Sequence, residues 1–283
     1  MRRSLALVAL AVLPAAVLPV AALASPGAGV EKWAVVVGID HFEGRTRPNV
    51  GAVGDAQDFR DMLLRTGWRS DHVLVLTDAN ATQAGMRNAF RWLATKATDR
   101  SYSVVHYSGH VKQVNGHEYL WPHDNRFIAD TEFGQAMRAV RGWLWVDVSG
   151  CEAAGFDEGI SARNRLFTAS SRGNEKSYEY PSWRNSVYTG LLADQGVLQR
   201  RADYNHDGRI SVTEAFRYAW ERAPAITARQ SSGPQHPYAA GGDGTEWFLD
   251  APAPPARQVA PAPTPAPPEG GAPPRHCTPL CIG

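Results

Sequence analysis

The sequence SVVHYSGH at residues 103–110 is the stretch that indicates the fold of this chain most clearly. Positions 104, 105 and 107 hold β-branched and aromatic residues of the kind found in short buried strands. The Ser-Gly pair that follows interrupts this run. The pattern predicts a strand that ends in a loop carrying His110. His106 lies inside the strand and is predicted to be structural.

Residues 144–156, LWVDVSGCEAAGF, repeat this layout further along the chain. An apolar run again precedes a Ser-Gly pair, and Cys151 follows with small residues behind it. Chemistry collects at the carboxyl ends of parallel strands in open α/β sheets, so the two loops are predicted to bring His110 and Cys151 together. A neighbouring imidazole turns a thiol into a usable nucleophile. Taken singly, such a Cys is more often a small core residue and such a His a structural group.

The rest of the chain alternates between strand and helix patterns. Residues 33–39, WAVVVGI, form an apolar run typical of a strand buried on both faces. Further strands are predicted at 73–76 and 165–170. Helices are predicted from Asp55 to Gly67 and over 82–97, where apolar residues recur at helical spacing. This order predicts an α/β fold with a mostly parallel sheet covered by helices on both faces.

The sequence Tyr-Ser-Gly-His at 107–110 and the later Cys-x-Ala-x-Gly-Phe at 151–156 resemble the caspase and metacaspase family of cysteine peptidases. The resemblance runs from about residue 33 to about residue 247 and includes WAVVVGID, EYLWPHDN, LFTASSRGNEKSYE and QHP. It implies a caspase-like three-layer fold and peptide hydrolysis by a Cys151–His110 dyad. It also implies that the amides of Val111 and Cys151 stabilise the oxyanion. The family usually has Gly after the His, but Val111 still offers an N–H.

The resemblance also implies a pocket for the side chain before the cut. Asp55 and Ser108 match positions where metacaspases bind Arg or Lys, so we expect cleavage after a basic residue. The family tends to place an acid two residues before the Cys, and here that position is Ser149, with Asp147 two residues further back. Asp55 is equally suited to cap a helix N-terminus. Acidic specificity, as in animal caspases, would need arginines that we cannot place.

Residues 203–214, DYNHDGRISVTE, match the calcium-loop pattern, with oxygen ligands at fixed spacing around a Gly turn and a Glu that closes the shell. The predicted ligands are Asp203, Asn205, Asp207, the Arg209 carbonyl, Ser211 and Glu214. We therefore expect Ca²⁺ and no organic cofactor. A single loop indicates a structural clip or an activity requirement rather than a paired sensor. The alternative is a loop that turns without metal.

Three regions are predicted along the chain: a signal peptide at 1–24, a peptidase domain at 25–250 and a Pro/Ala-rich tail at 251–283. The first region has basic residues, an apolar stretch and a small-residue cleavage site, which predicts a secreted or extracytoplasmic protein. A retained membrane anchor is the alternative. The tail has almost nothing to bury and is expected to be extended. After cleavage no membrane association is expected.

Charge and cysteine content narrow the partners. The formal net charge is +1, without a basic stripe, so no nucleic acid partner is expected. The expected partner is a polypeptide substrate, and the oligomeric state is left open. There are three cysteines. Cys277 and Cys281 are close enough in sequence to pair outside the cell, which would leave Cys151 as a free thiol, but the sequence equally allows two free thiols or pairing with another chain.

Two functional hypotheses follow from the sequence. The first is a secreted caspase-like cysteine endopeptidase that binds calcium. The second is a catalytically inactive caspase-fold protein that binds calcium and acts as a binding module. Val111 and Ser149 favour the second hypothesis because they depart from the family pattern. The intact His110 and Cys151 favour the first.

Overall fold

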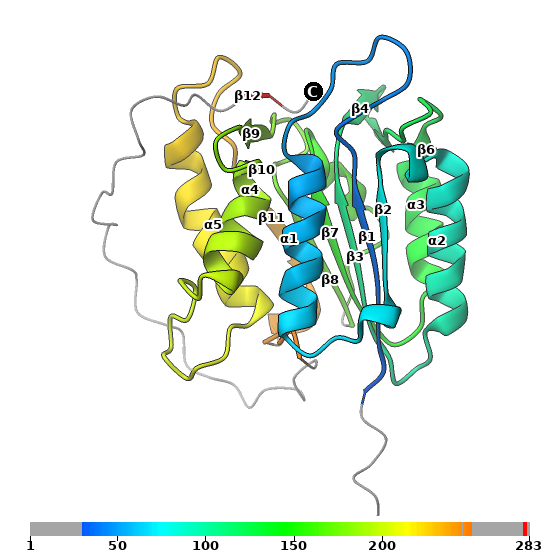
Figure 1. The fold of residues 1–283 in the computed structure, drawn as a ribbon, viewed down its shortest axis with the longest axis vertical. Coiled ribbons are helices and arrows are strands. Elements are labelled where there is room, and N and C mark those ends of the chain that lie inside the picture. Colours follow the sequence, from blue (N-terminus) through cyan, green and yellow to red (C-terminus); the bar gives the residue numbers. More distant parts are fainter. Residues whose placement is uncertain (1–29, 163, 245, 251–279, 282–283) are drawn as a thin grey trace, which may run out of the picture.

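The structure is a computed structural model that describes residues 30–162, 164–244, 246–250 and 280–281. Its centre is a six-stranded sheet in the order β11-β8-β7-β3-β1-β2 (Figure 1). The strands are β1 (Lys32–Gly38), β2 (Val73–Thr77), β3 (Tyr102–Ser108), β7 (Trp143–Ser149), β8 (Arg165–Ala169) and β11 (Tyr238–Gly241). All neighbours pair in parallel except β11, which runs antiparallel to β8.

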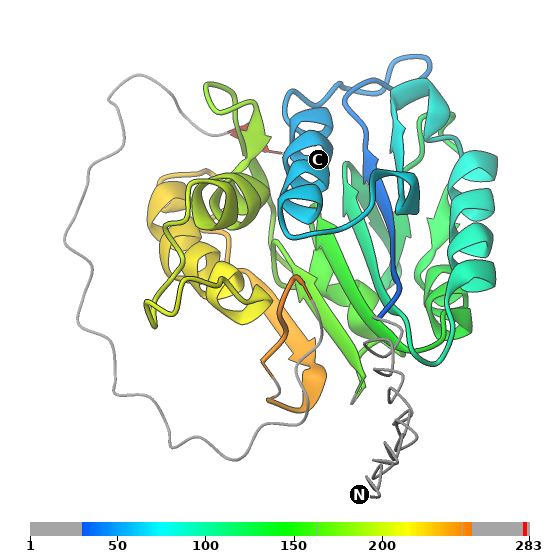
Figure 2. The ribbon, with the colours of Figure 1, turned by 60° about the horizontal axis from the view of Figure 1, so that its bottom comes forward.

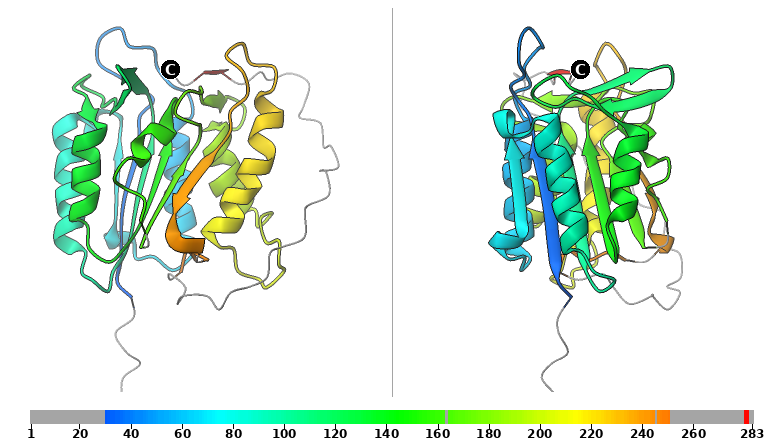
Figure 3. Two further views of the ribbon diagram at one scale, coloured as in Figure 1. Left: turned by 180° about the vertical axis from the view of Figure 1, so that it is seen from behind. Right: turned by 90° about the vertical axis from the view of Figure 1, so that its right-hand side faces the viewer.

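Helices cover both faces of this sheet, which gives three layers (Figures 2 and 3). One face carries α1 (Ala52–Arg65), α4 (Val187–Thr189), the π-helix η4 (Gly190–Leu198) and α5 (Val212–Thr227). The other face carries α2 (Gln83–Lys96) and α3 (Asp130–Ala139). Successive side chains of a strand point to opposite faces, so Val36 packs in the first layer and Val35 and Val37 pack in the second. The predicted α/β fold with a mostly parallel, doubly covered sheet is confirmed.

Two small sheets lie at the edge where the parallel strands end. One small sheet contains β4 (Val111–Val114), β5 (His117–Leu120) and β6 (Ile128–Ala129), and a second contains β9 (Tyr178–Tyr180), β10 (Asn185–Ser186) and β12 (Leu280–Cys281). The 3₁₀ turns are η1 (Ser70–His72), η2 (Asp78–Asn80), η3 (Ala153–Asp157) and η5 (Gly242–Gly244). The sequence did not predict α3 or the small sheets, whose strands are only two to four residues long.

The first helix begins earlier than expected. The N-cap of α1 is Gly51, which has no side chain that could form a capping bond, so Asp55 lies inside the first turn rather than at the cap. Asp55 is the acidic residue of that turn, and it is fully buried. The alternative that Asp55 caps the helix is therefore not what the structure shows. Its carboxylate points into the protein, toward the strand ends.

The predicted signal peptide at 1–24 and Cys277 lie outside the described residues, as does the tail except for residues 280–281. Within the described part of the chain, every helix is too short or too polar to span a bilayer.

Candidate active site

The pairing of β3 with β7 places His110 and Cys151 at the same edge of the sheet. Ser108 at the end of β3 is the register partner of Ser149 at the end of β7. The ladder continues one step further, since the Gly109 amide donates to the Ser149 carbonyl over 3.1 Å. His110 and Cys151 each follow two residues after these paired serines. The predicted neighbours therefore leave adjacent strands at equivalent positions.

Gly150 lets the two strand-end loops touch. A Cβ atom added to Gly150 would lie 2.7 Å from Cγ2 of Val111 and 2.9 Å from the Gly109 carbonyl oxygen. Real Cβ atoms do not approach other atoms so closely, so only glycine fits here without moving a loop. The close approach brings Val111, one predicted source of an oxyanion amide, beside the turn that carries Cys151.

His110 is held by the main chain of a distant loop. Its Nε2 lies 2.7 Å from the Arg47 carbonyl oxygen, and its ring stacks on Phe42 with centroids 4.8 Å apart. A carbonyl can only accept a hydrogen bond, so Nε2 carries the hydrogen and Nδ1 is the nitrogen that can take up a proton. The sequence could not reveal Arg47, because its contribution is a main-chain carbonyl that leaves no side-chain signature.

Cys151 is fully buried and lies against Ser177. The Ser177 amide donates to Sγ over 3.4 Å, and Sγ lies 3.8 Å from the Ser177 carbonyl oxygen. Glu152, directly after Cys151, has a positive φ of 51°, which turns the chain sharply away from the strand. Non-glycine residues in this conformation cost energy and cluster at functional sites. The turn leaves Cys151 at the point where the chain leaves β7.

Three predicted substrate-binding residues come together in a buried polar cluster next to this edge. Asp55 accepts hydrogen bonds from Ser108 Oγ at 2.7 Å, the Ser186 amide at 2.9 Å and Asn185 Nδ2 at 3.1 Å. Ser149 joins the cluster through Ser186, with the two Oγ atoms 3.0 Å apart. Burial raises the pKa of Asp55 to about 6, although these hydrogen bonds act in the opposite direction.

Asp147 points elsewhere and is not part of this cluster. Its carboxylate bonds His106 Nδ1 at 2.8 Å, the Tyr188 hydroxyl at 2.7 Å and Thr168 Oγ1 at 2.5 Å. His106 is buried against Phe59, with ring centroids 4.1 Å apart. The prediction that His106 is structural agrees with this placement. Asp147 and His106 form a network two residues deeper in the sheet than Ser149 and Ser108.

Glu179 is an acid that the sequence did not single out. It lies on β9, retains 3% exposure, and its Oε1 accepts hydrogen bonds from the Val50 and Gly51 amides at 2.8 Å each. Burial raises the pKa of Glu179 to about 7, and the nearby charges of Asp55 and Asp40 add to the increase. No motif marks this position. The available signal was only that Glu179 is the last residue of LFTASSRGNEKSYE, a segment included in the family resemblance.

The predicted calcium loop is folded as a tight turn. Gly208 has a φ of 80°, and its amide donates to Asp203 Oδ2 at 3.2 Å. Asn205 Oδ1 and Asp207 Oδ1 each accept from the main chain two residues on. Asp203 Oδ1 is buried and has no hydrogen-bond partner among the described residues. A buried unpaired carboxylate oxygen is costly, so this atom fits a cation ligand.

Glu214, the last predicted ligand, is turned toward main-chain amides. Its Oε1 accepts from the amides of Tyr204 and Asn205, and its Oε2 accepts from the amide and hydroxyl of Ser211. Ser211 and Glu214 form a capping box at the start of α5. Within the described ranges, no three His, Cys, Asp or Glu side chains converge as a metal site. Calcium binding therefore requires Glu214 to exchange at least some of these amide contacts for the ion.

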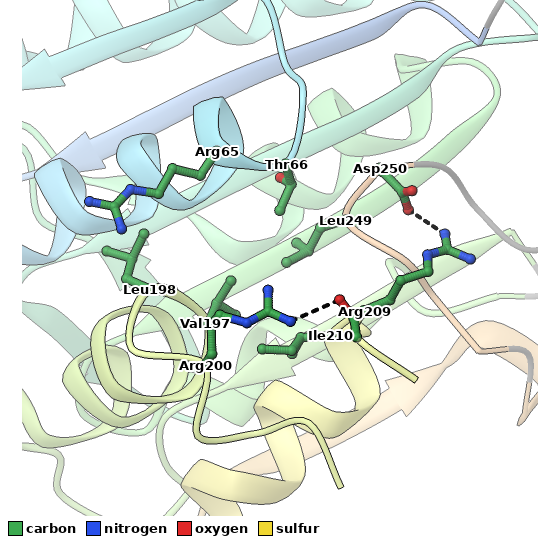
Figure 4. Close-up of a pocket in the computed structure, with 10 residues that line it drawn as sticks. Arg65, Thr66, Val197, Leu198, Arg200, Arg209, Ile210, Leu249 and Asp250 are labelled. Atoms are coloured by element: carbon green, nitrogen blue, oxygen red, sulfur yellow. Dashed lines mark hydrogen bonds and ion pairs between the residues drawn. The ribbon is translucent and has the colours of Figure 1, made fainter. Parts of the chain in front are cut away.

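The loop lies between the π-helix η4 and α5, at the end of the molecule opposite the carboxyl ends of the parallel strands (Figure 1). Beside it is a cavity of about 560 Å³ whose lining includes Arg65, Arg200 and Leu249 (Figure 4). Arg200 donates to the Gly208 carbonyl at 2.9 Å and lies 3.9 Å from Asp203 Oδ2. An ion in this loop would therefore act on the packing of two helices rather than on the reacting groups.

Comparison with known proteins agrees with the fold. Residues 31–235 match the family described as "Caspase domain". The chain belongs to the caspase-domain family of peptidases. It is 30% identical over 118 residues to Metacaspase-1 of Eremothecium gossypii, a match that covers 35% of this chain and 26% of that protein. The chain therefore spans only about a quarter of this relative.

A crystal structure of a Geobacter sulfurreducens protein has the same fold. Its TM-score is 0.56 at 14% sequence identity, and the superposition covers 75% of this chain and 94% of the other. At this identity the likeness concerns the fold alone.

Proposed function

We propose that this protein is a cysteine endopeptidase that cleaves polypeptides after Arg or Lys through a Cys151–His110 dyad. The observation that carries the proposal is the register of β3 and β7, which lets the His110 and Cys151 loops leave adjacent strands at equivalent positions. Membership of the caspase-domain family supports the same reaction class. The intact thiol and imidazole favour turnover over a purely binding role.

In the proposed reaction, Cys151 Sγ attacks the scissile carbonyl carbon while His110 Nδ1 takes up the thiol proton. The Arg47 carbonyl keeps the hydrogen on Nε2, so the other nitrogen is ready to accept. The amides of Val111 and Cys151 hold the oxyanion. His110 then protonates the leaving amine, and water hydrolyses the resulting thioester to release the acid and regenerate the thiol.

Basic specificity rests on two carboxylates next to the strand ends. Burial raises the pKa of both Asp55 and Glu179, and the nearby charge of Asp55 raises the pKa of Glu179 further. A substrate guanidinium or ammonium group would offset that cost by pairing with them. The family tends to place an acid two residues before the Cys, where this chain has Ser149. Glu179 supplies this second acid from β9.

Calcium binding by Asp203, Asn205, Asp207, the Arg209 carbonyl, Ser211 and Glu214 is part of the proposal. The unpartnered Asp203 Oδ1 supports it. When bound, the ion would neutralise the loop carboxylates and tie the start of α5 to the preceding helix. Since the loop is remote from Cys151, the proposed effect is on stability.

Export is proposed from residues 1–24. Mass spectrometry of the protein secreted by its natural host should find Ser25 as the first residue. Retention of residues 1–24 in a membrane fraction would instead support the anchor.

The deciding experiment is incubation of the purified protein with peptide libraries that vary the residue before the cut, with and without calcium. Dominant cleavage after Arg or Lys is expected. Dominant cleavage after Asp would refute the basic pocket. No cleavage of any peptide at any calcium concentration would favour the inactive binding module, for which the full burial of Cys151 is the structural support.

A further inference from the structure

A segment close to the C-terminus lies as a strand on β9, next to the candidate active site. β12 (Leu280–Cys281) pairs antiparallel with β9, with Leu280 opposite Glu179 and Cys281 opposite Tyr178. The other edge of β9 pairs with β10. β12 therefore occupies the outer edge of β9, at the end of the molecule where the parallel strands finish (Figures 1 and 3).

β9 begins next to the proposed nucleophile, Cys151. Ser177 directly precedes β9, and its main chain contacts Cys151 Sγ through an amide at 3.4 Å. Because the pairing is antiparallel, the step from Leu280 to Cys281 runs from Glu179 toward Tyr178, and so toward Ser177. The segment thus approaches the thiol with its carboxyl side leading. The part of a substrate that precedes the scissile bond must run in the same direction, because its last residue presents the carbonyl carbon that Sγ attacks.

We propose that the outer edge of β9 is a docking edge for an extended peptide and that Leu280–Cys281 is its resident occupant in cis. An open strand edge binds extended segments through main-chain hydrogen bonds, with little demand on their sequence. The inference rests on the proposed function only where it states that the tail competes with polypeptide substrates.

The connection to the domain makes such competition effective. Residues 251–279 join Asp250, the last described residue of the domain, to Leu280. A tethered segment acts at an effective concentration on the order of millimolar, so even a site with millimolar affinity is about half occupied. Removing the segment should then raise kcat/KM for peptide substrates about twofold or more.

The test uses hydrogen exchange of the β9 amides in the full-length chain carrying Cys151→Ala, which cannot turn over its own tail. Deletion of residues 280–283 should speed exchange over residues 179–180, because the outer edge of β9 loses its partner, whereas the Tyr178 amide keeps its bond to Gln235 Oε1. Deletion of residues 260–263 from the same tail is the matched control and should leave exchange unchanged. A synthetic peptide with the sequence of residues 276–283 should restore protection to the shortened chain.

Equal exchange with and without residues 280–283 would overturn the proposal. Protection that grows with protein concentration would also overturn it, since the occupant would then come from a second copy. Exchange does not depend on turnover, so a chain that shows the effect but cleaves no peptide would refute the proposed function and leave the docking edge standing. In the active protein, the same deletion should raise kcat/KM, and an unchanged or lower value would contradict competition with substrate.

Discussion

Replacement of Glu179 by Gln should make the protein more stable at neutral and basic pH. The pKa of Glu179 rises from 4.5 to about 7 in the folded protein because the carboxyl is buried near Asp55 and Asp40. One pKa unit corresponds to about 1.4 kcal/mol, so ionising Glu179 costs the folded state about 3 kcal/mol. The raised pKa favours the protonated form in the folded state. The stability that the protonated Glu179 carboxyl gives the folded state is therefore complete below about pH 4.5 and is lost as the pH rises toward about 7.

The assay is urea unfolding of the parent chain and Glu179→Gln at several pH values. The two should unfold with similar free energies near pH 4, and the variant should be more stable by about 3 kcal/mol near pH 8. Glu31→Gln, at an exposed position just before β1, is the matched control and should track the parent at every pH. A constant difference between parent and Glu179→Gln across the range would refute the burial of this charge.

Three further predictions concern the calcium loop, the strand-end contact and the deep network. Glu214→Ala should abolish the rise in melting temperature that calcium gives the parent chain, and a parent melting curve unmoved by calcium would show that the loop binds none. Gly150→Ala should lower kcat/KM by about a hundredfold through displacement of the Val111 loop, and unchanged kinetics would contradict the close contact. Asp147→Asn should cost about 2 kcal/mol in urea unfolding without altering selectivity for Arg substrates; a selectivity change equal to that of Asp55→Asn would place Asp147 in the pocket.

The central sheet could be predicted because burial on both faces leaves a direct signal in the sequence. The apolar runs at 33–39 and 144–146 lie in β1 and β7 as expected. The positions of His110 and Cys151 followed from the breaks at the ends of their strands. Residues 111–139 were not predicted, since β4 exposes most of its side chains and offers no periodic pattern.

The parts of the site that the sequence could not predict depend on tertiary contacts. Arg47 acts through its carbonyl, and any residue at that position would present the same atom. Glu179 becomes part of the site only because β9 packs against the start of α1. Asp147 and Ser149 point to the same face of β7, and only the structure shows that Tyr188 and Thr168 bind Asp147.

The most direct test of the central claim is the rate at which Cys151→Ala cleaves an Arg-containing peptide, compared with the parent chain under the same calcium concentration. Cys277→Ala is the matched control, because it replaces a cysteine of the tail by the same residue. The proposed dyad predicts that Cys151→Ala falls to the uncatalysed background while Cys277→Ala keeps the parent rate. Undiminished cleavage by Cys151→Ala would show that this thiol is not the nucleophile.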